Sequence, residues 1–188
     1  MKNLQKKNHL ITNTFILLIL LITSCESSGQ KSEESKPEGS IHEAAFMGNV
    51  KLMKAHIATK SDLNEKDEYG SSPLTITCIF NKTEVAKLLI EAGADLNIKS
   101  GDGSTPLHSA AFFCRTDIVK MLLKKGADTS IRNNYGSTAM ESISGPFADV
   151  KPFYDQMSKD LGPFGLKLDY ERIESTRPVI VEMIKASN

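Results

Sequence analysis

The sequence predicts an all-α solenoid of stacked helix-turn-helix units joined by short hairpin loops. Two segments recur after 33 residues: Ser72-Pro73-Leu74 returns as Thr105-Pro106-Leu107, and Gly93-Ala94-Asp95 returns as Gly126-Ala127-Asp128. Three glycines share the same spacing of 33 residues without an insertion: Gly70, Gly103 and Gly136. Self-similarity at this period indicates a repeat in which each unit buries its apolar face only against its neighbours.

The third repeat shows why each unit is expected to hold two helices. Thr105 suits the cap of a first helix, and Pro106 suits its first position because the missing N–H costs nothing there. A second helix is indicated by an apolar stripe at helical spacing: Ile118, Val119, Leu122 and Leu123. Gly126 follows this stripe, where helices often end in a left-handed residue. A polar stretch then leads into the next unit.

These residues carry a resemblance to a known family. The segment 103–111, followed by 117–123 and by Gly126-Ala127-Asp128, resembles the ankyrin repeat almost position for position. The resemblance covers Ser40 to about Ser144 and implies L-shaped units that bind proteins through a concave face and protruding loop tips. We expect about four repeats, at approximately 40–66, 67–99, 100–133 and 134–188.

The fourth repeat is interrupted. Gly145-Pro146 is expected to end its first helix after two turns. Ile180 to Lys185 matches the second-helix pattern that begins at Ile118, but 62 positions later instead of 33. We infer a 29-residue insertion at about 145–176, consisting mainly of loop with one short helix within 149–161. The alternative is an unrelated capping helix at the C-terminus.

The N-terminus has the pattern of an export signal. A positively charged start precedes an apolar run from Phe15 to Ile22, which is too short to span a bilayer. Ile22-Thr23-Ser24-Cys25 is similar to the lipobox of bacterial lipoproteins, in which the signal is cleaved before a cysteine that is then lipidated. This resemblance implies a signal peptide at 1–24 and a membrane anchor at Cys25. An ordinary signal peptide and an uncleaved anchor are the alternatives.

Residues 25–39 are expected to form a lipid-anchored flexible tether, because 26–39 contain no large apolar residue. As flexible coil, such a tether places the domain on the order of 20 Å from the lipid. The expected location is the bacterial cell envelope, on the periplasmic or cell-surface side. The 23 basic and 23 acidic residues balance, which argues against nonspecific nucleic-acid binding. We expect a monomer that binds an unidentified protein partner.

Two sets of residues are candidates for that binding. The first set, which we call the apolar column, follows each pair of small core residues: Phe46, Met47, Ile79, Phe80, Phe112 and Phe113. By the resemblance the column lies near the concave face, where an exposed stripe marks a partner site. The alternative is that the first residue of each pair packs between repeats while the inserted segment covers the rest. The second set is the loop tips: Tyr69, Asp102 and Tyr135.

The sequence gives no positive sign of catalysis, and we expect no cofactor and no metal. His42 and His108 stand at the ankyrin histidine position, which implies a structural hydrogen-bonding role. Cys78 and Cys114 are expected to be free, mostly buried thiols, with Cys114 replacing an inter-helix glycine. Two other functions compete with protein binding. One is a purely structural envelope lipoprotein. The other is an enzyme whose site lies in the insertion and uses one or more of four acids: Asp155, Asp160, Asp169 and Glu171.

Overall fold

The structure is a computed structural model, and it describes residues 37–187. The expected signal peptide, Cys25 and most of the expected tether lie outside the described residues. Within 37–187, no helix is both long enough and apolar enough to cross a membrane.

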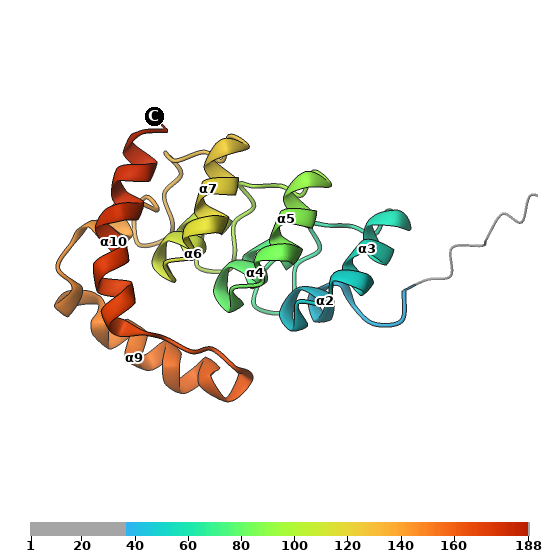
Figure 1. Cartoon of the computed structure of the whole chain (residues 1–188), viewed down its shortest axis with the longest axis horizontal. Coiled ribbons are helices and arrows are strands. Elements are labelled where there is room, and N and C mark those ends of the chain that lie inside the picture. The colour runs from blue at the N-terminus through green and yellow to red at the C-terminus, as the bar shows by residue number, and fades with distance from the viewer. Residues whose placement is uncertain (1–36, 188) are drawn as a thin grey trace, which may run out of the picture. The chain divides into compact units, whose positions relative to one another are not determined.

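Two layers of helices stack along the described unit (Figure 1). The first layer contains the first helix of each repeat: α2 (Ile41–Met47), α4 (Pro73–Phe80), α6 (Pro106–Phe112) and α8 (Glu141–Ser144). The second layer contains α3 (Val50–Ala58), α5 (Thr83–Glu91), α7 (Thr116–Lys124) and α10 (Tyr170–Lys185). Each helix contacts the next helix of its own layer, and no strand occurs among residues 37–187. The prediction of an all-α solenoid is therefore confirmed.

The helix ends follow the sequence signals. The hydroxyls of Ser40 and Ser72 accept hydrogen bonds from backbone N–H groups in the first turns of α2 and α4. Gly48 ends α2 in the left-handed region, at a φ of 72°. Cys114 takes a φ of 53° at the corresponding turn after α6, which confirms that it replaces a glycine. Gly126 adopts a φ of 83° after α7, as expected.

Small residues set the distance between repeats. Four alanines at the centre of the first layer have no exposed surface: Ala44, Ala45, Ala110 and Ala111. Because an alanine side chain is short, the backbones of α2, α4 and α6 can approach closely. Leu89 and Leu122 fill the second layer and are fully buried. Burial of each leucine contributes about 1.5–3 kcal/mol, which makes contact between repeats the main source of stability.

The loop tips bond to one another across repeats. The N–H of Gly101 donates to the Tyr69 carbonyl at 3.3 Å, and the N–H of Asn134 donates to the Asp102 carbonyl at 2.9 Å. Gly103 has a φ of +76° and lies directly against Asn134 of the next loop. The 33-residue glycine spacing therefore reflects a left-handed backbone at all three positions, and at Gly70 and Gly103 also a close approach between loops.

The insertion is helical, so the prediction that it is mainly loop is wrong. It contains α9 (Phe147–Leu161) and the 3₁₀ turn η1 (Gly162–Phe164). Helix α10 begins at Tyr170, before the expected end of the insertion at about 176, and continues through Pro178. Asp169 caps α10 by accepting the N–H of Arg172 at 3.0 Å. Burial of Ile173, more than one turn before Pro178, stabilises this early start.

The fourth repeat retains both layers despite the insertion. Helix α8 contacts α6, and α10 contacts α7. These contacts favour an interrupted repeat over an unrelated capping helix. Arg177 of α10 joins the two parts: its Nε donates to the Ile143 carbonyl at 3.1 Å and its Nη2 donates to the Gly145 carbonyl at 3.0 Å. A cation at the C-terminal end of a helix also complements the helix dipole, so this buried arginine stabilises the one-turn helix α8.

His108 joins the third repeat to the fourth. Its Nδ1 accepts the N–H of Thr105 at 3.2 Å, while Nε2 lies 3.0 Å from the Ser137 carbonyl. A ring that accepts at Nδ1 and donates at Nε2 is neutral. His42 makes the corresponding contact in the first repeat, where Nε2 lies 2.9 Å from the Glu65 carbonyl. The predicted structural role of both histidines is confirmed.

Acidification is expected to weaken the fold through His108. Burial lowers the pKa of His108 below its usual value. The contribution of the neutral ring is therefore complete above about pH 6.5, the pKa of an unfolded histidine. It is lost as the pH falls from there toward the folded-state pKa, because the unfolded chain takes up the proton first. Urea unfolding between about pH 7.5 and pH 5 measures this loss.

The chain supplies its own control for this titration. Thr75 occupies the position of His108 in the second repeat, where its hydroxyl lies 3.1 Å from that of Ser72. The variant His108→Thr carries no titrating group at this position and should show a flatter stability profile over the same pH range. An equal slope in the variant and the wild type would show that other groups cause the pH dependence.

Candidate protein-binding surface

The structure divides the apolar column into a covered end and an open end. At the covered end, Phe113 is only 5% exposed and Phe112 stacks on Tyr154 of α9 with ring centroids 4.3 Å apart. The Tyr154 hydroxyl donates to the Phe112 carbonyl at 2.6 Å. Phe113 is therefore core, and Phe112 is half-buried against the insertion. The alternative interpretation is met only in part, because the insertion covers the first residue of this pair and not the second. Helix α9 lies along the lower side of the first layer (Figure 1), and its Tyr154 covers Phe112.

The open end lies on the first and second repeats. Met47 is 64% exposed at the end of α2. Phe46 and Phe80 are half-buried and meet edge to face, with ring centroids 4.7 Å apart. Ile79 is also half-buried. We call these four residues the open column: Phe46, Met47, Ile79 and Phe80. It remains a candidate surface, whereas the structure does not support partner binding by Phe112 and Phe113.

The loop tips also separate into two kinds. Tyr69 is 74% exposed and Tyr135 is 77% exposed, so both rings are accessible to a partner. Asp102 instead turns its carboxylate toward its own loop, where Oδ1 accepts the Ser100 hydroxyl at 2.6 Å and the Ser104 N–H at 3.0 Å. Burial raises the pKa of Asp102, but these hydrogen bonds outweigh burial and lower it. Asp102 therefore acts mainly in holding the turn.

A small open pocket of about 180 Å³ adjoins the open column at Phe80. Six residues line it: Phe80, Asn81, Arg115, Gly165, Leu166 and Lys167. The pocket forms where the chain leaving α9 and η1 passes the ends of α4 and α6. Of the six, only Phe80 was a candidate from the sequence. The other five were missed because the sequence does not reveal which repeat the insertion folds back against.

The two cysteines of the described residues are buried and unreactive. Cys78 and Cys114 are free and buried, as predicted. Burial raises the pKa of Cys78 to about 12 and that of Cys114 to about 11. The Cys114 Sγ donates to the Ile173 carbonyl at 3.6 Å. Because the thiolate is the reactive form of cysteine, neither side chain is suited to act as a nucleophile at neutral pH.

The acids of the insertion have structural or solvent-exposed positions. Asp155 pairs with Lys151 at 2.9 Å, and its hydrogen bond to Lys151 lowers its pKa. Asp160 accepts from Gln156 at 2.7 Å, and Asp169 caps α10. Glu171 is exposed, and none of the four acids lines the pocket. The contacts therefore give no support to an enzyme site in the insertion.

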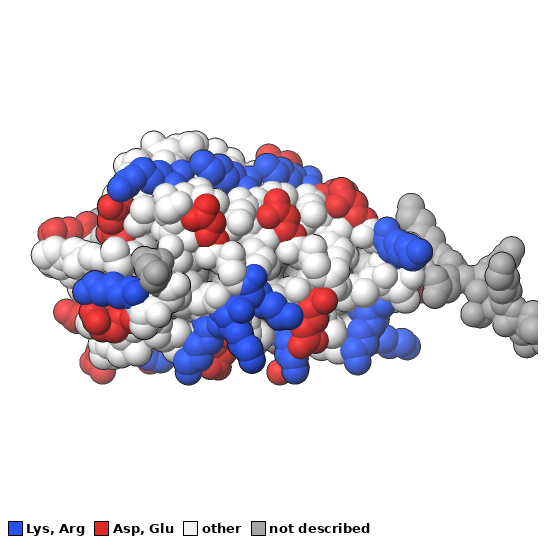
Figure 2. Space-filling view, turned by 90° about the horizontal axis from the view of Figure 1, so that it is seen from above, with Lys and Arg blue, Asp and Glu red and all other residues white. Residues whose placement is uncertain are grey.

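The described residues also bear on metal and nucleic-acid binding. Within 37–187, no group of three or more His, Cys, Asp or Glu side chains is arranged to hold a metal ion. Basic and acidic side chains occur close together on the face that Figure 2 shows. The predictions of no cofactor and no nucleic-acid partner stay predictions.

The stacked layers and their tip loops define an α-solenoid. Residues 41–133 match the family model for ankyrin repeats in three copies. The fold is thus an all-α ankyrin solenoid, in which the matched segment ends before the interrupted fourth repeat. A search of curated proteins found no match to the chain. Ankyrin repeats are generally protein–protein interaction modules, and proteins built from them are typically non-catalytic.

Proposed function

We propose that this protein is a non-catalytic binding module that holds a protein partner on the open column and the exposed tyrosines of the loop tips. The observation that carries the proposal is the open column itself, in which Met47 is exposed beside the half-buried pair of Phe46 and Phe80. Apolar side chains in this arrangement supply the central contacts of protein interfaces. Tyr69 and Tyr135 add exposed rings with polar tips on the loop tips, as a second set of contacts.

Helix α9 limits where the partner can bind. Tyr154 occupies the surface above Phe112, so the third repeat has no free apolar residues of the column. A partner that follows the column from α2 therefore meets the end of the insertion at Leu166 and Lys167. The apolar part of the proposed interface covers the first two repeats and ends at the pocket. Tyr69 and Tyr135 would contribute from the loop tips, outside this apolar part.

The lipobox-like segment supports a second part of the proposal. Lipidation of Cys25 would anchor the protein to a bacterial envelope membrane, and residues 26–36 would serve as part of a tether. Anchoring raises the effective concentration of the module for any partner near the same membrane. A purely structural lipoprotein has the same anchor but no partner for the open column, so partner capture distinguishes the two functions.

Crosslinking in the native envelope, with mass spectrometry of the captured proteins, tests both parts. We expect the wild type to be found with membranes and to capture the same partner repeatedly. Met47→Glu should keep the fold but lose the partner about 10-fold or more, because a charge replaces an apolar contact at the proposed interface. Cys25→Ser should move the protein to the soluble fraction while the purified domain keeps its affinity for the captured partner.

A matched control places the same charge elsewhere. Val179 is exposed on α10, outside the apolar column, so Val179→Glu should leave capture unchanged. If Met47→Glu and Val179→Glu capture the partner equally well, the open column is not the interface. If the wild type enriches no partner, the structural-lipoprotein alternative is favoured. Retention of Cys25→Ser on membranes would contradict the lipid anchor.

A further inference from the structure

Arg115 has an unusual position for an unpaired charge. It precedes α7, is only 6% exposed, and forms no ion pair with any described carboxylate. Its Nε donates to the Cys78 carbonyl at 3.4 Å and its Nη2 donates to the Ile79 carbonyl at 2.9 Å. Both carbonyls belong to the last turn of α4. The guanidinium thus caps the helix of the preceding repeat, where the helix dipole favours a cation.

The second terminal nitrogen of Arg115 has no such role. Nη1 makes no hydrogen bond within residues 37–187. It is not fully enclosed by protein atoms either, because it is absent from the buried side-chain atoms that lack a partner. Arg115 itself lines the pocket beside Phe80. We therefore take Nη1 as the donor that a ligand in the pocket would meet.

The surroundings of Arg115 add positive charge and no negative charge. Lys167 and Asn81 line the same pocket and contribute further hydrogen-bond donors, and no acidic residue lines it. Arg172 approaches from α10, where its Nη1 donates to the Cys114 carbonyl at 3.2 Å. Burial, followed by the charge of Arg172, lowers the pKa of Arg115 to about 10, so the guanidinium remains protonated at neutral pH. An anion beside Arg115 would favour the charged guanidinium and so oppose both effects.

We propose that this pocket binds a carboxylate side chain of the protein partner, with Arg115 Nη1 and Lys167 as its principal donors. The inference rests on the proposed function, because the pocket shares Phe80 with the open column. A partner segment with an apolar residue beside a glutamate or aspartate would place the apolar side chain on Phe80 and the carboxylate against Arg115. Guanidinium–carboxylate hydrogen bonds are charge-assisted and are roughly twice as strong as neutral ones.

Two short peptides provide a direct test on the whole protein. N-acetyl-Phe-Glu-amide is the probe, and N-acetyl-Phe-Gln-amide is its uncharged twin. The Nε–Hε signal of Arg115 is followed by nitrogen-15 NMR and assigned by its loss in Arg115→Lys. We expect the glutamate peptide to shift this signal and to bind about 10-fold more tightly than the glutamine peptide, with an affinity that falls as salt is added.

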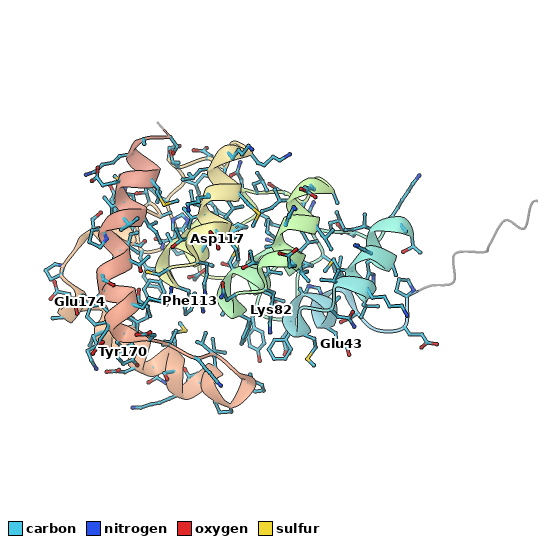
Figure 3. All side chains as sticks on the ribbon, in the orientation of Figure 1. Glu43, Lys82, Phe113, Asp117, Tyr170 and Glu174 are labelled. Carbon is cyan, nitrogen blue, oxygen red and sulfur yellow. The ribbon has the colours of Figure 1, made fainter. Side chains whose placement is uncertain are left out.

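Variants identify the pocket without relying on a change that disturbs the fold. Lys167 is exposed, so Lys167→Gln should fold normally and weaken the glutamate peptide several-fold. Lys82 is the matched control, because it precedes α5 as Arg115 precedes α7 and lies outside the pocket lining. In Figure 3, Lys82 lies nearer than Phe113 to the N-terminal end of the described unit. Lys82→Gln should leave peptide binding unchanged.

Three results would overturn the proposal: equal binding of the two peptides, equal weakening by Lys167→Gln and Lys82→Gln, or equally tight binding of inorganic phosphate. The last result would show a general anion site. These outcomes are separable from failure of the proposed function, which is measured by capture with Met47→Glu. If Met47→Glu loses the partner but the wild type binds both peptides equally, the open column is the interface and the carboxylate site is absent.

Discussion

Replacement of Tyr154 by alanine is expected to lower the free energy of unfolding of the C-terminal half by about 3–5 kcal/mol, as for other buried aromatic residues. Tyr154 is fully buried and is the one residue of α9 that is buried. Its ring stacks on Phe112 at 4.3 Å and also approaches Phe147 at 5.8 Å. Loss of these contacts leaves a cavity between α9 and α6. Urea unfolding followed by circular dichroism measures the change.

The conservative variant Tyr154→Phe keeps both ring contacts and removes only the hydroxyl. The Phe112 carbonyl then loses the hydrogen bond of 2.6 Å, which is expected to cost about 1 kcal/mol. Amide hydrogen exchange adds a spatial readout, since only α9 and its immediate neighbours should lose protection in Tyr154→Ala. Two results would show that Tyr154 does not hold the insertion on the solenoid. One is a smaller loss of unfolding free energy in Tyr154→Ala than in Tyr154→Phe. The other is a loss of amide protection that is spread evenly over α2 to α5.

The second large effect is expected for Gly103→Ala, with a loss on the order of 3 kcal/mol. Part of the loss comes from the φ of +76°, a left-handed conformation that costs a residue with a side chain about 1–2 kcal/mol. The rest comes from the next loop, because an added Cβ would lie 2.8 Å from the backbone nitrogen of Asn134 and still closer to its side-chain oxygen. That nitrogen donates to the Asp102 carbonyl at 2.9 Å. Overpacking of this kind adds roughly 1–3 kcal/mol.

Gly136 separates the two contributions because it occupies the same loop position one repeat later. Its φ is +77°, and no atom lies within 4 Å of an added Cβ. Gly136→Ala should therefore show the conformational cost alone, about 1–2 kcal/mol in urea unfolding. If Gly103→Ala and Gly136→Ala are equally destabilised, contact between the loops contributes little, and the spacing of the glycines reflects backbone conformation alone.

The repeats were predictable because local signals and contacts between neighbours agree in them. The serine caps before α2 and α4, and the left-handed Gly48 and Gly126, each act within one helix-turn-helix unit. The same apolar positions then recur at every repeat, so each helix packs against a copy of itself. The left-handed Cys114 shows that the turn after α6 keeps its geometry without a glycine.

The insertion was predictable only in part, because its signals conflict. Gly145-Pro146 indicated a helix boundary, and α8 does end before Gly145. Helix α10 nevertheless continues through Pro178, since Asp169 caps it and Ile173 is buried early in the helix. Tertiary contact thus outweighs the loss of one helical hydrogen bond at a proline.

The candidate site required the structure for the same reason. The sequence placed Phe112 and Phe113 in the same column as Met47. Only the fold shows that Tyr154 covers Phe112 and that Phe113 is buried, while Met47 stays open. Arg115 follows Cys114 in a turn that gives no sign of burial. Its position at the end of α4 arises from the stacking of one repeat on the next.

The sequence by itself determined the number of matched repeats, their helix ends and their core, because a repeat is specified by contacts at a fixed spacing along the chain. The tertiary structure decided which part of the apolar column is open and how Arg115 and Lys167 come to line one pocket. These features depend on where α9 and the segment after η1 fold back, and no periodic signal encodes that position. The contact between Tyr154 and Phe112 joins residues 42 positions apart and has no equivalent in the other repeats.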